Sequence, residues 1–188
     1  QITIPDSVLN IGIAAFTGDT NIKTLYFNAV NCNRPLFLET NNRITNVFLG
    51  ENVIRIPGAF CANCQLLTTV TIPKSVKFIG GYAFSSCTGL TSIDIPDSVI
   101  VIGNSAFADC INLRSVTIGV SVDSIEDKAF SEDKAIKEII IKAETPPHTQ
   151  DFTFYRMSSD VSIYVPCGST VLYRSDANWS YYQNIIGL

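Results

Sequence analysis

One motif recurs at nearly constant intervals along most of the chain and constrains its fold more than any other feature. The segment VTIPKSVKFIGGYAFSSCTGLTS, from Val70, aligns without a gap with IDIPDSVIVIGNSAFADCINLRS, from Ile93. The sequence number rises by 23 from most units to the next, by 22 once and by 24 at the last step, and the units begin at Ile2, Leu25, Val47, Val70, Ile93, Val116, Ile139 and Ile163. One such unit cannot bury its apolar face alone, so the units must stack into a solenoid.

Each unit opens with a predicted strand. Its first and third positions are apolar in every unit and the position between them varies, which is the two-residue period of a half-buried strand. Pro73 and Pro96 end the strand because proline cannot donate to a sheet ladder. A second, short extended stretch follows. Ala83, Phe84 and Cys87, spaced by three and four positions, then predict a single helical turn.

Two units depart from this pattern. The second unit has Asn31 and Arg34 where other units carry Val and Ile, so its return wall is expected to differ. In the third unit IPGAF replaces IGxxAF, and Phe60 comes one residue early before Cys64 restores the phase. We therefore expect a local bulge or a tighter turn at Phe60.

The end of the chain is expected to form a cap. The pattern becomes irregular from about residue 142, where a double proline forbids a regular continuation, and one more strand follows. Residues 167–188 carry Trp179 and three tyrosines but no repeat. Because a solenoid needs a terminal cap over its core, we predict a solenoid over 1–166 and an aromatic cap over 167–188.

Composition narrows the possible partners. The net charge is -4, 46% of residues are hydrophobic and 16% are charged. With 13 Lys and Arg against 17 Asp and Glu, the chain has no basic field to attract nucleic acid or anionic lipid, and no apolar run is long enough to insert into a membrane. The chain begins at Gln1 in the middle of a repeat, so we expect it to be a piece of a longer protein.

The six cysteines are interpreted as packing residues. Cys64, Cys87 and Cys110 occupy the same column of three successive units, where a free cysteine acts as a small buried hydrophobe. Cys61 and Cys64 form a lone CxxC, without the second pair that a zinc site needs. Stacked cysteines could reach the separation of a disulfide, and the sequence leaves that alternative open.

The polar residues suggest no catalytic chemistry. His148 is the single histidine and stands in a column otherwise held by isoleucine, so it is interpreted as a structural or loop residue. Asp19 and Asp133 replace cysteine in their column and are expected to accept hydrogen bonds from loop amides. We predict no catalytic, cofactor-binding or metal-binding residue, no cofactor and no enzyme activity.

The pattern IPxSVxxIGxxAFxxCxxLxx, present from Ile72 and from Ile95, resembles the BspA-like leucine-rich-repeat surface proteins of bacteria. The resemblance is strong over residues 1–142. It implies an α/β fold: a right-handed leucine-rich-repeat solenoid with a parallel sheet on its concave face, and short extended segments and single helical turns on its other sides. It also implies a secreted or cell-surface location and adhesion to host matrix or cell-surface proteins, with no catalytic motif.

The concave face is the candidate binding surface. Its outward strand positions are Tyr26, Phe48, Thr71, Asp94, Thr117, Ile140 and Tyr164, flanked by Thr24, Asn46, Thr69, Ser92, Ser115, Glu138 and Ser162. Apolar members gather toward the two ends, where interface anchors are expected. We predict a monomeric, extracellular module that binds a host or bacterial surface protein. The alternatives are a passive spacer that presents another domain, and carbohydrate binding by Trp179 and neighbouring tyrosines.

Overall fold

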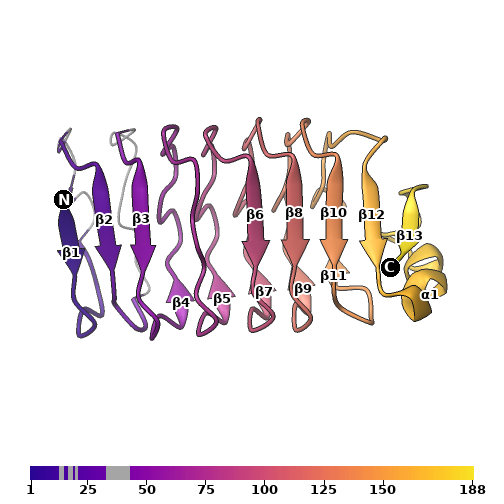
Figure 1. Ribbon diagram of the computed structural model, residues 1–188, viewed down its shortest axis with the longest axis horizontal. Helices are drawn as coiled ribbons and strands as arrows, with labels where there is room; N and C mark the ends of the chain where they lie inside the picture. Colours follow the sequence, from indigo (N-terminus) through magenta and orange to yellow (C-terminus); the bar gives the residue numbers. More distant parts are fainter. Residues whose placement is uncertain (13–14, 17–18, 20, 33–42) are drawn as a thin grey trace.

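The computed structural model describes residues 1–12, 15–16, 19, 21–32 and 43–188. Figure 1 shows the coils of the chain stacked side by side along the long axis, with the N-terminus at one end and the C-terminus near the other. The expected departure at Arg34 lies outside the described residues. The stacking of units that the repeat predicts is confirmed.

The concave face carries the longer strands, all of them parallel. A three-stranded sheet contains β1 (Ile2–Ile4), β2 (Thr24–Phe27) and β3 (Asn46–Leu49). A five-stranded sheet contains β6 (Ser92–Ile95), β8 (Ser115–Ile118), β10 (Glu138–Ile141), β12 (Ser162–Val165) and β13 (Ile185–Gly187). Equivalent residues of successive units are register partners, as in the pairs Ile93 with Val116 and Val116 with Ile139.

A second parallel ladder forms the opposite wall. It contains β4 (Arg55–Ile56), β5 (Phe78–Ile79), β7 (Val101–Ile102), β9 (Ser124–Ile125) and β11 (His148–Thr149). The sequence analysis placed His148 in the isoleucine column of this wall, and that placement is wrong by one residue. Thr149, not His148, pairs with Ile125 in the isoleucine column, and His148 is exposed beside Ser124. The last coil is one residue longer than the regular unit, which accounts for the shift.

The structure also corrects the helical turn predicted in each unit. Ala83, Phe84 and Cys87 are buried together as expected, but the segment consists of successive turns. Tyr82 and Ser86 have φ angles of 59° and 57°, which a right-handed helix excludes. Alternate amides, including those of Tyr82 and Phe84, instead donate to carbonyls of the next coil. The amides between them, such as those of Ala83 and Ser85, donate to carbonyls three residues earlier in the same coil. Hydrogen bonds between coils and within tight turns therefore replace those of a helix.

The structure shows neither the bulge nor the tighter turn that the sequence predicts at Phe60, a segment that lies within the described residues. Ala59 and Asn63 have positive φ angles, like Tyr82 and Ser86, their equivalents in the next unit, so the backbone keeps its phase. The side chains differ instead. Phe60 occupies the position that Ala83 has in the next unit, and Cys61 occupies the position of Phe84. This exchange of a large and a small residue between neighbouring positions keeps the core filled.

A row of stacked aromatic rings forms the centre of the core. Ring centroids are separated by 5.4 Å between Phe84 and Phe107, 5.3 Å between Phe107 and Phe130, and 5.6 Å between Phe130 and Phe154. The ring of Trp179 lies 5.4 Å from that of Phe154. Because Phe84, Phe107, Phe130 and Phe154 occupy equivalent positions of successive units, repetition of the sequence extends the stack from coil to coil.

The aromatic cap is confirmed, and it contains a strand that the sequence did not predict. A 3₁₀ turn η1 (Cys167–Ser169) leads into helix α1 (Thr170–Ser175), and β13 then pairs with β12 as one more rung of the sheet. Trp179 is 1% exposed and Tyr173 is fully buried. The indole Nε1 donates to the Pro147 carbonyl at 2.9 Å. Trp179 is therefore a core residue that closes the end of the solenoid.

Replacing Trp179 is expected to destabilise the protein. Trp179→Ala removes a buried aromatic side chain and should cost about 3 to 5 kcal/mol, which thermal unfolding followed by circular dichroism would measure. Trp179→Phe keeps most of the ring contact with Phe154 and should cost less. A Trp179→Ala variant that melts like wild type would contradict the assignment of Trp179 to the core.

Candidate protein-binding face

Strand alternation places the predicted surface residues on the outside of the concave sheet. Tyr26 and Asp94 alternate with buried residues and are exposed, and Thr71, which precedes buried Ile72, is exposed as well. Of the other predicted positions, Phe48, Asn46 and Ser92 are exposed, and Thr117, Ile140, Tyr164 and Glu138 are half-buried. The structure thus places all ten, which we call the outward ladder, at outward positions of the concave side, in two separate sheets and in the segment at Thr71 between them.

The strongest apolar feature of this ladder is the pair Tyr26 and Phe48. Their strands β2 and β3 are register partners at these positions. The ring centroids are 4.9 Å apart and the planes differ by 13°. Tyr26 is 37% exposed and Phe48 is 50% exposed. The stack holds both rings in place, so a partner could bury them with little additional loss of side-chain freedom.

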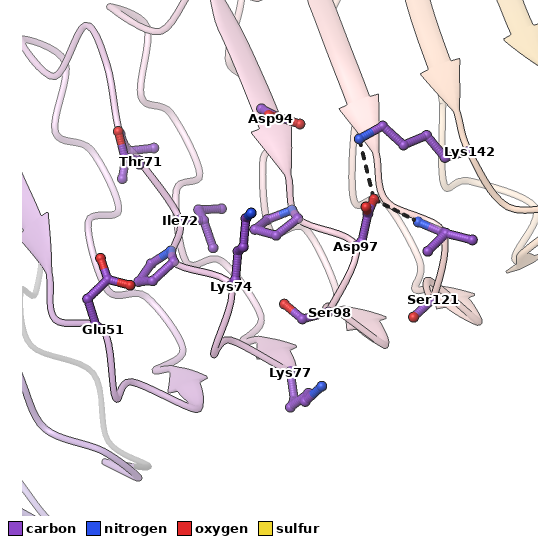
Figure 2. Close-up of a pocket in the computed structure, with 14 residues that line it drawn as sticks. Glu51, Thr71, Ile72, Lys74, Lys77, Asp94, Asp97, Ser98, Ser121 and Lys142 are labelled. Atoms are coloured by element: carbon purple, nitrogen blue, oxygen red, sulfur yellow. Dashed lines mark hydrogen bonds and ion pairs between the residues drawn. The ribbon is translucent and has the colours of Figure 1, made fainter.

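The concave sheet is interrupted next to Phe48. Thr71 forms only an isolated bridge to Phe48, and no strand pairing joins the described segment 69–72 to β6. The two parts of the sheet remain connected through β5 and β7 on the opposite wall. A hollow of about 940 Å³ lies at the interruption (Figure 2) and is lined by residues from both of its sides, including Thr71, Ile72 and Asp94.

Charged groups of both signs line this hollow. Figure 2 shows Lys74 between Glu51 and Asp97, with Asp94 on β6 above and Lys77 pointing away. The Asp97 carboxylate lies 3.3 Å from the Lys142 ammonium and accepts a hydrogen bond from the Val120 amide, also at 3.3 Å. This pair is exposed and contributes little to stability. The charged side chains that line the hollow therefore offer hydrogen-bond donors and acceptors to a partner surface.

A second apolar group, at the other end of the ladder, includes one residue that the sequence analysis missed. Ile140 and Tyr164 are register partners, and Tyr164 also pairs with Ile186 on β13. Ile186 is 41% exposed and extends the outward ladder by one position. The signal that could have revealed it is Ile185-Ile186-Gly187, a short apolar segment that follows the strand at Ile163 at nearly one repeat length.

The buried thiols are packing groups, as predicted. The six cysteines form no disulfide, and five of them are buried. Burial raises the pKa of the Cys87 and Cys110 thiols, so both stay protonated and unreactive. Each donates to a carbonyl of the preceding coil, Cys87 to Cys61 at 3.0 Å and Cys110 to Phe84 at 3.2 Å. Within the described part of the chain, no group of three potential ligands could hold a metal ion.

Asp133 occupies the next position of this cysteine column and was interpreted wrongly. It is fully buried, and neither carboxylate oxygen has a hydrogen-bond partner, whereas loop amides were expected to donate to it. Burial is the main cause that raises its pKa to about 8, and the nearby Asp109 and Glu132 carboxylates add to the effect. The backbone amide of Cys110 lowers the pKa of Asp133, but it does not form a full hydrogen bond with the carboxylate.

Parallel ladders on two walls, one column of side chains per repeat position and an open outward ladder define a leucine-rich-repeat solenoid. The sequence pattern of the BspA-type leucine-rich repeat region matches residues 1–87 and 56–177 in six copies. The chain therefore belongs to the BspA-type leucine-rich-repeat family, whose members are typically non-catalytic. A comparison with curated proteins finds no match.

Three solved structures share the fold. A leucine-rich repeat protein from Bacteroides ovatus is 24% identical with a TM-score of 0.63, and the alignment covers 87% of this chain and 47% of that one. The pneumococcal vaccine antigen PcpA is 23% identical with a TM-score of 0.66, with 90% and 40% covered. A leucine-rich repeat protein from T. pallidum is 21% identical with a TM-score of 0.69, with 100% and 86% covered. The chain thus spans less than half of the first two proteins.

Among the described residues the longest helix, α1, has six residues. No helix in this part of the chain is long and apolar enough to cross a membrane.

Proposed function

We propose that the chain is a non-catalytic, extracellular protein-binding module that attaches a bacterial cell to a host matrix or cell-surface protein through its concave face. The observation that carries this proposal is the exposed, stacked pair of Tyr26 and Phe48 beside an open hollow. Rigid aromatic side chains next to polar groups are typical anchors of protein interfaces. The buried thiols and the fully buried Asp133 offer no accessible nucleophile or base.

The shape of the surface supports a large, folded partner. The hollow extends from Glu51 in the third unit to Lys142 in the seventh, and a second hollow of about 280 Å³ lies directly beside Phe48. Residues of the outward ladder line both hollows: Thr71 borders each of them, with Asp94 in the first and Phe48 in the second. A partner that covers the ladder from Tyr26 to Tyr164 would contact most units of the solenoid. Solenoid proteins typically bind their partners through an extended concave surface that many repeats form together.

Replacing both aromatic anchors is expected to weaken binding without unfolding the chain. Tyr26→Ala combined with Phe48→Ala should reduce capture by arrayed extracellular-matrix proteins at least about tenfold, because anchor residues typically contribute 1 to 2 kcal/mol or more each. The melting temperature should hardly change, since both rings are exposed. Surface plasmon resonance would measure the affinity, and circular dichroism the melting.

Tyr82→Ala is the matched control. Tyr82 is also an exposed tyrosine, 54% accessible, but it lies on the turn wall and not on the concave ladder. It should leave binding unchanged. If wild type captures no matrix or surface protein, the chain is better described as a passive spacer; if the double variant binds as tightly as wild type, the partner uses another face.

A further inference from the structure

We infer that a second site, at the junction of the last coil and the cap, binds a neutral carbohydrate. The pocket has a volume of about 490 Å³, within the range of small-ligand sites. It is lined by residues 149–151 and 154–157 of the last coil and by residues 177, 178, 181 and 182 of the cap. None of these residues belongs to the concave ladder, so the site is independent of the proposed protein-binding face.

The structure separates the cap aromatics into two groups with different roles. Trp179 and Tyr173 are buried and hydrogen-bonded to backbone carbonyls, so they stabilise the fold. Tyr181 is 78% exposed and Tyr155 is 43% exposed, and both line the pocket. The carbohydrate alternative that the sequence attached to Trp179 is therefore wrong for that residue. The exposed tyrosines are the ones that a ligand can reach.

The pocket has a rigid aromatic corner. The rings of Tyr181 and Tyr182 are 5.4 Å apart and nearly perpendicular, at 88°. Tyr182 in turn packs on Phe154 at 5.8 Å, and Phe154 packs on buried Trp179. The corner is thus supported by the core. Such perpendicular rings offer one flat face and one edge, which suit the apolar C–H face of a pyranose ring.

Planar polar side chains surround this corner. The Asn178 amide donates to the Thr149 carbonyl at 2.9 Å across the junction, which holds its orientation. The Arg156 guanidinium lies over the Tyr155 ring at 5.2 Å and donates through Nη1 to Glu132 at 3.0 Å. Gln150 and Asp151 complete the rim. Amide, carboxylate and guanidinium groups can each form paired hydrogen bonds with neighbouring sugar hydroxyls.

The charges favour a neutral ligand. Arg156 is the single cation among the described residues that line the pocket, and Glu132 already neutralises it. Asp151 adds a negative charge to the rim, and the whole chain carries -4. A phosphate, sulfate or sialic acid would therefore meet no attractive field, whereas neutral hexoses and N-acetylhexosamines would meet aromatic faces and polar partners.

The test uses an array of printed neutral, sialylated and sulfated oligosaccharides, probed with the tagged chain displayed multivalently. Wild type should bind one or more neutral oligosaccharides. Tyr181→Ala and Tyr155→Ala should each reduce that signal at least about fivefold, the scale of one lost aromatic contact. Their melting temperatures should remain close to that of wild type, because both side chains are exposed.

Two control variants make the result specific. Tyr82→Ala removes an exposed tyrosine elsewhere and should keep glycan binding. Tyr26→Ala with Phe48→Ala should also keep it, so that failure of one site can be told from failure of the other. The inference is overturned if wild type binds no oligosaccharide, if binding is confined to the sialylated or sulfated ones, or if it survives Tyr181→Ala combined with Tyr155→Ala.

Discussion

Raising the pH from 5 to 7 is expected to lower the stability of the folded chain by about 1.4 kcal/mol per pH unit, through the single side chain of Asp133. Its carboxyl group has a pKa of about 8 in the folded protein, against about 3.9 in an unfolded chain. Between these values the folded state keeps a proton that the unfolded state has released. The contribution of Asp133 to the stability of the folded state is therefore greatest below about pH 4 and is lost as the pH rises to about 8.

The expected effect is large enough to measure by thermal melting. For a chain of this size, 1 kcal/mol corresponds to about 2 to 4 °C, so the melting temperature should fall by about 6 to 11 °C between pH 5 and 7. The stacked Cys110 thiol does not titrate in this window, because burial raises its pKa. The neighbouring Glu132 is already ionised there, since Lys134 and Arg156 lower its pKa.

Asp133→Cys should remove this pH dependence. The substitution restores the cysteine of the column, and the new thiol would lie where Cys87 and Cys110 donate to carbonyls of the preceding coil. At pH 8 the variant should melt several degrees above wild type. Asp19→Cys is the matched control, because Asp19 stands in the same column of the first unit but is exposed. Equal pH profiles for wild type and Asp133→Cys would contradict the assignment.

Ile95→Asp is expected to abolish cooperative folding. Ile95 is fully buried in β6 and pairs with Ile118 of the next coil. Loss of the isoleucine costs about 1.5 to 3 kcal/mol of burial, and the buried carboxyl adds several kcal/mol, even if it takes up a proton. Together these costs approach the whole stability of a typical domain, about 5 to 15 kcal/mol. Circular dichroism should show a broad transition or none at 25 °C.

Ser92→Asp provides the control for this variant. Ser92 lies three residues earlier on the same strand β6, but its side chain is exposed. The same charge at that position should change the melting temperature by only a degree or two. A soluble Ile95→Asp protein with an unchanged melting curve would refute the stacking of equivalent isoleucines.

The sequence correctly predicted the stacked units and the outward ladder, because both follow from one repeated pattern of apolar side chains. Ile72, Ile95 and Ile118 are all buried, as their shared column requires. Its prediction of a helical turn failed because spacings of three and four residues place Ala83, Phe84 and Cys87 on one face in a helix and equally in two successive tight turns. Only the φ angles of Tyr82 and Ser86 distinguish the two arrangements.

What the sequence by itself determined is the set of equivalences: which residues lie above one another, and hence which are buried and which point outward. The tertiary structure decided what happens where those equivalences end or are interrupted. The gap in the sheet beside Thr71, the extra rung at Ile186 and the division between buried Trp179 and exposed Tyr181 all depend on packing between segments that share no repeat. A periodic pattern specifies contacts only between its own copies, so contacts with a non-repeating segment appear only in the folded chain.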